Sequence, residues 1–234
     1  ISFLYKMAFK CCNKVFVLNN DDKDFFVNKK YLKEQKCVVI NGIGIDVNEW
    51  PQTALSFSKK ILMISRLIKS KGVYDFCEIA KTVRLIDPTI TFYLAGAEFE
   101  IKRENLSPYI DQGDIIYLGN VNNIKDIIHD FDIVVLPSYY REGLPRSLLE
   151  AMATGRPVIA YNNVGSNVAV IDSYNGYLIE KGNIQAFAEK ILQLTKDTKT
   201  SVLFAENSRQ NAVDFFSSSI INKIIYNILK EEIC

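Results

Sequence analysis

Two glutamates frame the segment with the clearest chemistry in this chain. The run 139–155 reads YYREGLPRSLLEAMATG and separates Glu142 from Glu150 by seven residues, around a Gly-Leu-Pro turn. Pro145 suits the first position of the helix that follows, because its fixed φ fits a helix and its missing N–H is not needed there. The unpaired backbone N–H groups at such a helix start carry the positive end of the helix dipole, so they favour an anion such as a phosphate.

Both carboxylates suit hydroxyl groups better than the phosphate itself. A carboxylate beside a phosphate is repelled by it, so Glu142, just ahead of the helix, is expected to accept hydrogen bonds from hydroxyls. Glu150, on the second helical turn, can reach a different part of the same ligand. Two acceptors that flank an anion site indicate a ligand with hydroxyls at both ends and phosphate in the middle, which is the layout of a nucleotide sugar.

Two cations that could balance such a phosphate occur in the run SRLIKSKG. Arg66 directly follows a predicted strand, and Lys71 begins the next helix beside Gly72. A diphosphate paired with one Arg and one Lys gains charge-assisted hydrogen bonds of roughly 1.5–3 kcal/mol each. These two contacts would hold a diphosphate ligand firmly.

Short apolar runs rich in β-branched residues alternate with helix-period stretches from Lys60 onward. Such nearly continuous apolar strands are typical of a parallel sheet covered by helices on both faces. We therefore expect an α/β fold with a doubly wound parallel sheet, whose ligands bind at the carboxyl ends of the strands. Strands are predicted at 61–65, 89–96, 114–119, 132–138, 157–161 and 176–180, and helices near 72–86, 123–131 and 145–154.

The two ends of the chain differ from this pattern. A Lys-bearing helix (5–14), a strand VFVLN, a polar acidic stretch NNDDKD and a strand KCVVI precede NGIGIDVNEW, which is typical of a linker. We expect 1–45 to be this linker and the tail of a preceding domain that is mostly absent. The ligand-binding domain would cover 46–215, and 216–234 would form an amphipathic helix that closes the domain or returns to the missing neighbour.

The composition is that of an ordinary soluble globular protein, with 48% hydrophobic and 24% charged residues. A net charge of +1 gives no sign of a surface for a polyanion, so no nucleic acid partner is expected. No apolar run is long enough to span a bilayer. The odd number of cysteines indicates reduced, buried thiols rather than metal ligands; they are Cys11, Cys12, Cys37, Cys77 and Cys234.

The motifs SRL…KG, LAG, LGNV, LPSYYREGLPRSLLEAMATGRPVIA and NGYLI together resemble the C-terminal domain of a retaining glycosyltransferase of the GT-B fold, family 4 (group 1). The resemblance covers about 36–195 and is greatest to the branch that builds capsules, O-antigens and lipid-linked glycans. It implies a Rossmann-like domain that binds a nucleoside diphosphate sugar, with UDP as the expected nucleotide. The sugar would pass with retention to a saccharide or lipid-linked acceptor held by the N-terminal domain, at the cytoplasmic face of a bacterial membrane.

The resemblance also implies residue roles. Arg66 and Lys71 would bind the diphosphate and stabilise the leaving nucleotide, while Glu142 would hydrogen-bond the hydroxyls of the transferred sugar. No metal or other cofactor is implied, because Arg and Lys supply the electrostatic stabilisation. Glu150 would bind the ribose. The donor-binding set follows the strands, and comprises Arg66, Lys71, Asn120, Val121, Glu142, Gly143, Leu144, Pro145 and Glu150.

Within this set the backbone also has expected roles. Gly143 and Leu144 would contact sugar and phosphate through main-chain groups, and main-chain groups around Asn120 and Val121 would recognise the base. In one place the sequence departs from the family pattern: Val168 stands where an acidic residue is usual. The family's acceptor site and catalytic-site histidine belong to the N-terminal domain, so the isolated chain is expected to be inactive.

Several features also have a plainer explanation. Asp130-Phe131-Asp132 spells the Asp-x-Asp of metal-dependent transferases, but a helix cap followed by a strand start explains it better, and His129 is expected on the surface or in packing. The lysines 6, 10 and 14 could touch anionic lipid, although a solvated helix face is the commoner explanation. Glu142 could pair with a neighbouring arginine, at 141 or 146, and the tyrosines 139 and 140 could line the pocket or its rim.

Two rival hypotheses remain open at this stage. A UDP-sugar epimerase of the UDP-GlcNAc 2-epimerase type shares the GT-B architecture, but SRL…KG and EGLPRSLLEAM disfavour it. A non-catalytic nucleotide-sugar-binding module would act only with a separate partner chain. It would bind the donor without turnover.

Overall fold

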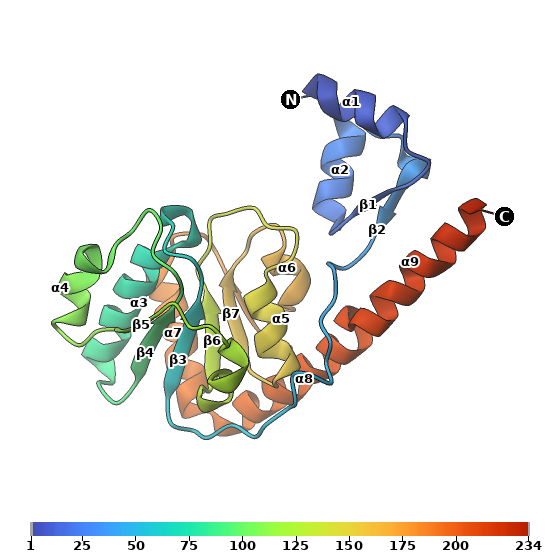
Figure 1. Ribbon diagram of the computed structural model, residues 1–234. Coiled ribbons are helices and arrows are strands. Elements are labelled where there is room, and N and C mark those ends of the chain that lie inside the picture. Colours follow the sequence, from blue (N-terminus) through green and yellow to red (C-terminus); the bar gives the residue numbers. More distant parts are fainter. Residues whose placement is uncertain (1, 234) are drawn as a thin grey trace.

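A six-stranded parallel sheet forms the centre of the computed structural model, which describes residues 2–233 (Figure 1). The order of the strands is β5-β4-β3-β6-β7-β8. All six predicted strands are present, and the predicted α/β fold with a parallel sheet is confirmed. The strands are β3 (Lys60–Ile64), β4 (Thr91–Ala95), β5 (Ile116–Gly119), β6 (Ile133–Leu136), β7 (Val158–Tyr161) and β8 (Gly176–Ile179).

The strand order reverses between β3 and β6. The chain proceeds outward from β3 through β4 to β5, then returns to place β6 on the other side of β3, in register from Ile61 opposite Ile133. Ligands of doubly wound sheets bind outside the carboxyl ends of the strands at such a reversal. The loops that meet there are 65–72, after β3, and 137–145, after β6.

Helices cover both faces of this sheet (Figure 1). Helix α3 packs against α7, and α5 packs against α8. The central strands β6 and β7 are buried at every position, which explains their continuous apolar runs. The helices of this domain are α3 (Val73–Ile86), α4 (Ser107–Ile110), α5 (Arg146–Ala153), α6 (Ser166–Ala169), α7 (Ile184–Lys196) and α8 (Thr198–Phe216).

One local prediction was wrong. The helix expected at 123–131 is a pair of 3-10 turns, η4 (Ile124–Asp126) and η5 (Ile128–Asp130), which meet at Ile127, where φ is −117°. The polar acidic stretch NNDDKD caps and begins helix α2 (Asn20–Asn28). Aspartates in the first turn of a helix complement its dipole.

An N-terminal unit stands apart from the six-stranded sheet (Figure 1). It contains α1 (Ser2–Lys10), β1 (Val15–Val17), α2 and β2 (Cys37–Val39), with β1 and β2 paired in parallel. Helix α9 (Ser218–Ile233) extends from the sheet domain toward the same side, and Lys14 pairs with Glu232 at 3.5 Å.

The chain crosses between these parts beside a short bridge. The Ile45 N–H donates to the Phe216 carbonyl, and the Ser218 N–H donates to the Ile45 carbonyl. The predicted boundaries at 45 and 216 fall at this bridge, while the division into domains stays a prediction. Among residues 2–233, no helix is long and apolar enough to cross a membrane.

The Asp-x-Asp sequence has a structural role. The Asp132 carboxylate is nearly buried and accepts hydrogen bonds from the backbone N–H groups of residues 56, 57 and 59 and from two serine hydroxyls. It therefore holds residues 56–59 against the start of β6. His129 lies on the surface, 3.6 Å from Asp130. Over the described residues, no group of His, Cys, Asp and Glu side chains is arranged to hold a metal ion.

Among the four cysteines that the structure describes, the prediction of buried thiols is correct for one. Cys77 is buried in α3, and this burial raises the pKa of its thiol to about 12, so it is unreactive at neutral pH. Cys11 is exposed, and Cys12 and Cys37 are partly exposed, because the N-terminal unit is too small to bury them. All four are free thiols, and Cys234 lies outside the described residues.

Candidate functional site

Lys71 and Glu142 meet where the strand order reverses. Lys71 ends the 3-10 turn η2 (Lys69–Lys71) after β3, and Glu142 lies in the loop between β6 and α5. The Lys71 Nζ is 2.7 Å from the Glu142 Oε1, and both side chains are largely shielded, with exposed fractions of 15% and 17%. The Ser138 hydroxyl donates to the same carboxylate oxygen at 3.4 Å. Two residues far apart in the sequence thus form one ion pair at the ligand-binding edge.

The loops that carry this pair are packed closely together. Gly72 has a φ of +74°, and a Cβ on it would lie 1.8 Å from the Pro137 carbonyl oxygen, so only glycine fits this approach. The Ser70 carbonyl accepts hydrogen bonds from the N–H groups of both Tyr139 and Tyr140 at 2.9 Å. The Lys71 ammonium lies 5.1 Å from the centre of the Tyr140 ring. The position of Lys71 is therefore determined by backbone contacts and by an aromatic face.

Tyr139 anchors the loop after β6 to the domain. The hydroxyls of Tyr139 and Tyr161 each donate to the Asp75 Oδ2 at 2.6 Å, which joins the loop to β7 and α3. Burial, together with these bonds to Asp75, raises the pKa of both tyrosines. The Asn163 amide donates to the Tyr140 carbonyl at 2.7 Å.

Of the residues that support this loop, Asp75, Tyr161 and Asn163 were not predicted. Their only sequence signal was polar side chains at the end of a strand or the start of a helix.

Glu150 is largely buried on the second turn of α5. Burial raises the pKa of its carboxyl group, while the Arg146 guanidinium, which donates to its Oε1 at 2.8 Å, acts in the opposite direction. Pro145 is the N-cap, in an extended conformation, rather than the first helical residue as predicted. The suggested pairing of Glu142 with Arg141 or Arg146 is wrong, because Arg146 pairs with Glu150 and Arg141 has a partner in the N-terminal unit.

The remaining predicted residues surround this centre. Arg66 follows β3, and its exposed guanidinium lies 5.9 Å from the centre of the Phe99 ring; no described residue forms an ion pair with it. Asn120 and Val121 follow β5 at the edge of the sheet, where Asn120 is exposed and Val121 is half-buried against the core. Val168, which replaces the usual acidic residue, packs against the hydrophobic core.

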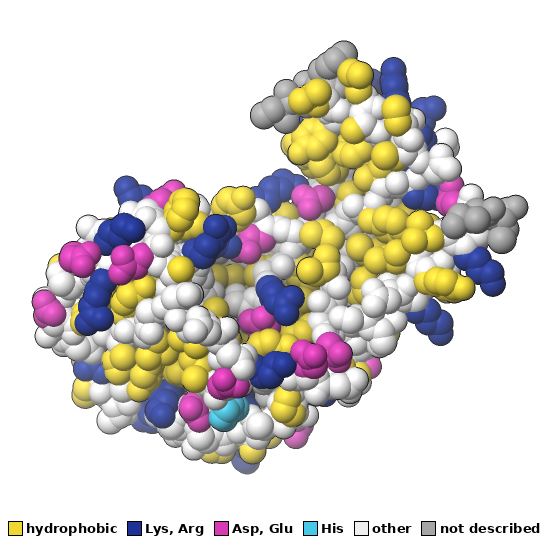
Figure 2. All heavy atoms as spheres, viewed as in Figure 1, with side chains coloured by type: hydrophobic (Ala, Val, Ile, Leu, Met, Phe, Trp, Pro, Cys, Tyr) yellow, Lys and Arg dark blue, Asp and Glu magenta, His cyan; other side chains and the backbone are white. Residues whose placement is uncertain are grey.

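A hollow of about 350 Å³ lies beside the Lys71–Glu142 pair. Charged and hydrophobic side chains mix on the surface where the N-terminal unit meets the sheet domain (Figure 2). In the described part of the chain, the backbone N–H groups of Gly143 and Leu144 donate to no protein acceptor. The lining of this hollow includes Leu18, Gly42, Ile43, Gly44, Tyr140, Glu142, Gly143, Leu144 and Arg146.

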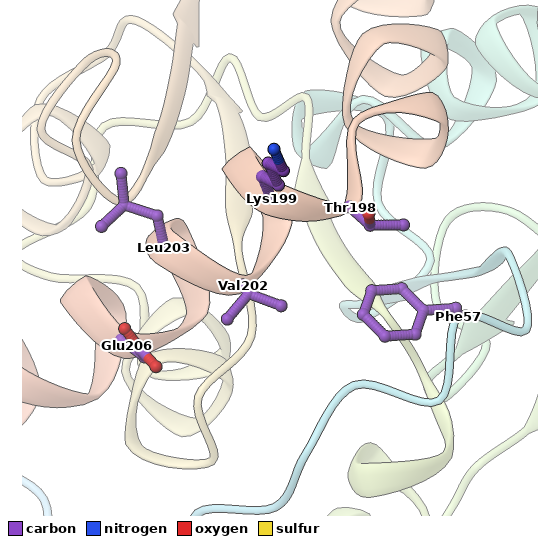
Figure 3. A pocket seen from close by; sticks show the side chains of 6 residues that line it. All are labelled: Phe57, Thr198, Lys199, Val202, Leu203 and Glu206. Atoms are coloured by element: carbon purple, nitrogen blue, oxygen red, sulfur yellow. The ribbon is translucent and has the colours of Figure 1, made fainter.

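A second hollow, of about 480 Å³, has a different character (Figure 3). Phe57, just before β3, lies opposite Val202 of α8, and Leu203 also lines this hollow. It lies at the amino ends of the strands, opposite the edge where doubly wound sheets bind ligands. Its lining includes Lys199 and Glu206, but among the described residues these two form no ion pair like that of Lys71 and Glu142. The first hollow is therefore the candidate site.

Known glycosyltransferases resemble this chain over most of its length. The chain is 29% identical to an N,N'-diacetylbacillosaminyl-diphospho-undecaprenol alpha-1,3-N-acetylgalactosaminyltransferase of Campylobacter jejuni, over 96% of this chain and 62% of that protein. It is 28% identical to a UDP-Gal:alpha-D-GlcNAc-diphosphoundecaprenol alpha-1,3-galactosyltransferase of Escherichia coli, over 93% and 61%. The chain thus spans about three fifths of the length of these curated relatives.

Solved structures share the fold. The Anabaena protein HepE in complex with UDP superposes with a TM-score of 0.87 at 22% identity, over 97% of this chain and 66% of that one. A mutant of the Staphylococcus aureus protein TarM, solved in a complex that includes UDP, superposes with a TM-score of 0.84 at 24% identity, over 96% and 45%. At these identities the likeness establishes the fold alone.

The family itself follows from a match over most of the sheet domain. Residues 47–211 match the family described as Glycosyl transferases group 1. This range contains both glutamates, Lys71 and every strand of the large sheet. The chain belongs to the group 1 glycosyl transferases.

Proposed function

We propose that this chain forms the donor-binding part of a family 4 glycosyltransferase with the GT-B fold. It would transfer a sugar with retention from a UDP-sugar to a saccharide or lipid-linked acceptor in the synthesis of bacterial surface polysaccharides. The main observation behind this proposal is the ion pair between Lys71 and Glu142, whose Nζ and Oε1 atoms are 2.7 Å apart. The pair lies where the strand order reverses, just before the start of α5. The relatives named above for undecaprenol-linked glycans and the UDP complexes of similar fold support this proposal.

Each residue has a distinct task in the proposed reaction. Lys71 and Arg66 would bind the donor diphosphate, with the free N–H groups of Gly143 and Leu144. Glu142 would accept hydrogen bonds from the sugar hydroxyls. Backbone groups around residues 120 and 121 would contact the base.

The bond from the anomeric carbon to the outer phosphate would break as an acceptor oxygen bonds to that carbon on the same face. The proton of the acceptor would leave with the departing phosphate. Preorganised cations stabilise the charge that develops on this leaving group, so the proposal requires no metal and no other cofactor. The acceptor would be bound by an N-terminal domain of the intact enzyme, so the isolated chain would bind donor without turnover.

Calorimetric titration of the chain with UDP, GDP and ADP, followed by UDP-sugars, tests this proposal. We expect binding of UDP in preference to the other two nucleotides, because the relatives named above include an enzyme that uses a UDP-sugar. If none of the three nucleotides gives a heat of binding, the proposal of a donor site in this chain is contradicted. Preference for GDP or ADP would keep the site and change its base.

The ribose role of Glu150 gives a separate prediction. Glu150→Ala is expected to weaken UDP binding about tenfold, since a hydrogen bond to a charged acceptor contributes roughly 1.5–3 kcal/mol. The same substitution should not affect binding of 2′,3′-dideoxy-UDP, which lacks the ribose hydroxyls. Glu189→Ala, at an exposed position of α7, is the matched control. An equal loss for both nucleotides would show that Glu150 acts on the helix and not on the ribose.

We also propose peripheral contact with the inner face of the cell membrane, with the enzyme in the cytoplasm. Lys6 and Lys10 of α1 are exposed and line a hollow of about 630 Å³ together with Met7, Lys30 and Lys33. Lys14 is less available, because it pairs with Glu232 and donates to the Gln35 carbonyl. Such clusters of basic residues attract anionic lipids.

Charge reversal on α1 tests the membrane contact. The double substitution Lys6→Glu and Lys10→Glu is expected to reduce co-sedimentation with phosphatidylglycerol vesicles about tenfold or more, at about 1 kcal/mol for each basic residue near the surface. Neutral phosphatidylcholine vesicles and the variant Lys190→Glu on α7 are the controls. Unchanged sedimentation of the double variant would exclude α1 as the contact.

A further inference from the structure

Asn19 lies at the junction between the N-terminal unit and the candidate site. It follows β1 as the N-cap of α2, and only 1% of the residue is exposed. Its Oδ1 accepts from the Asp22 N–H at 2.7 Å, and its Nδ2 donates to the Gly143 carbonyl at 2.8 Å. The Nδ2 also lies 3.1 Å from the Asp22 carboxylate and 3.5 Å from the Glu142 carbonyl oxygen. One side chain therefore caps a helix and holds two carbonyls of the donor loop.

The contacts around these carbonyls determine which way the peptide groups face. In a planar trans peptide the N–H of one residue points away from the carbonyl of the residue before it. The Glu142 and Gly143 carbonyls face Asn19, so the N–H groups of Gly143 and Leu144 face the opposite side. A Cβ on Gly165 would lie 2.6 Å from the Glu142 carbonyl oxygen, so this glycine packs against the same groups.

The segment is also held from the side of the N-terminal unit. A Cβ on Gly143 would lie 2.3 Å from the Leu18 side chain, and Arg141 pairs with Asp22 at 2.9 Å. The Arg141 guanidinium also donates to the Asp21 carbonyl at 3.1 Å. The unit formed by β1 and α2 therefore contacts the loop that carries Glu142 at several points, and Asn19 is the buried one.

We propose that Asn19 is a positioning residue for the donor diphosphate. By holding the two carbonyls, it orients the N–H groups of Gly143 and Leu144 toward the outer phosphate, which lies next to the sugar bound by Glu142. This inference rests on the proposed function, and assigns the N-terminal unit a part in donor binding. It predicts that changing Asn19 weakens the binding of UDP, which has the outer phosphate, more than the binding of UMP, which lacks it.

Asn19→Ser separates this role from helix capping. Serine is a good N-cap, so α2 keeps its cap, but its shorter side chain cannot also reach the two carbonyls. Asn183→Ser is the matched control, because Asn183 caps α7 through the Ala186 N–H at 3.0 Å and lies outside the candidate site. Calorimetric titration with UMP and UDP and a thermal unfolding curve are measured for both variants and the unaltered chain.

We expect Asn19→Ser to weaken UDP binding about tenfold and to leave UMP binding within about twofold, since the hydrogen bonds to the outer phosphate are charge-assisted. Its unfolding temperature should match that of Asn183→Ser. Equal weakening of UMP and UDP, or unchanged UDP binding, would overturn the inference. If Asn19→Ser does not fold, Asn19→Asp keeps the cap and the size, and its carboxylate repels the two carbonyls; unchanged UDP binding by that variant overturns the inference as well.

The failure of this inference is distinguishable from failure of the proposed function. An unaltered chain that binds no UDP contradicts both. A chain that binds UDP, loses that binding in Lys71→Ala and keeps it in Asn19→Ser retains the donor site and excludes the role of Asn19.

Discussion

Lys71→Ala is expected to weaken UDP binding about 100-fold and to abolish measurable sugar transfer by the intact enzyme. The lost charge-assisted hydrogen bond alone contributes roughly 1.5–3 kcal/mol, or about 10- to 150-fold in affinity. The substitution also leaves the Glu142 carboxylate without its partner at 2.7 Å, beside the bound phosphates. Since like charges repel, the effect should lie toward the upper end of that range.

Two nucleotides, UDP and UMP, the nucleoside uridine and one control variant test this expectation. Lys69→Ala removes an exposed lysine from the same 3-10 turn, so its UDP affinity should equal that of the unaltered chain. Uridine and UMP should bind Lys71→Ala nearly normally, because Lys71 is proposed to contact the outer phosphate. If calorimetry finds UMP and UDP weakened equally, Lys71 does not bind that phosphate.

Glu142→Gln is expected to strengthen the binding of UDP and to weaken the binding of the UDP-sugar relative to that of UDP. UDP has no sugar hydroxyls for the carboxylate, and must separate Lys71 from Glu142 in order to bind. Removing the negative charge frees Lys71, so UDP should bind about fivefold more tightly, as a shielded ion pair contributes about 1 kcal/mol. The UDP-sugar should no longer bind more tightly than UDP, since glutamine accepts weaker hydrogen bonds from the sugar hydroxyls than glutamate does.

Transfer by the intact enzyme should fall roughly 10²- to 10³-fold in the same variant, the range for loss of one preorganised electrostatic contact. The ratio of the UDP and UDP-sugar dissociation constants is the decisive measurement, with Glu189→Gln on α7 as the control. Parallel changes for both ligands would mean that Glu142 does not contact the sugar. In the double variant Lys71→Ala, Glu142→Gln, the loss of UDP affinity should be smaller than in Lys71→Ala alone, because paired residues are not additive.

Local sequence patterns predicted the strands better than the helices. The central strands β6 and β7 are apolar runs buried on both faces, and such a run has few alternatives once β-branched residues dominate it, whereas the edge strand β5 is partly exposed. The stretch 123–131 has three isoleucines at helical spacing, yet it forms two short 3-10 turns that meet at Ile127. The helix that begins in NNDDKD was not predicted; its N-cap, Asn19, also contacts the distant Gly143 carbonyl.

The sequence by itself determined the types and spacing of the chemical groups: two glutamates around a turn, a lysine beside a glycine after a strand, and the alternation of strands and helices. These are local properties, since a turn, a cap or an apolar run depends on neighbouring residues. Only the tertiary structure decided that Lys71 pairs with Glu142 and that Asn19 reaches the donor loop. Both contacts join residues far apart in the chain. They exist because the strand order reverses between β3 and β6 and because the N-terminal unit packs on the loop after β6.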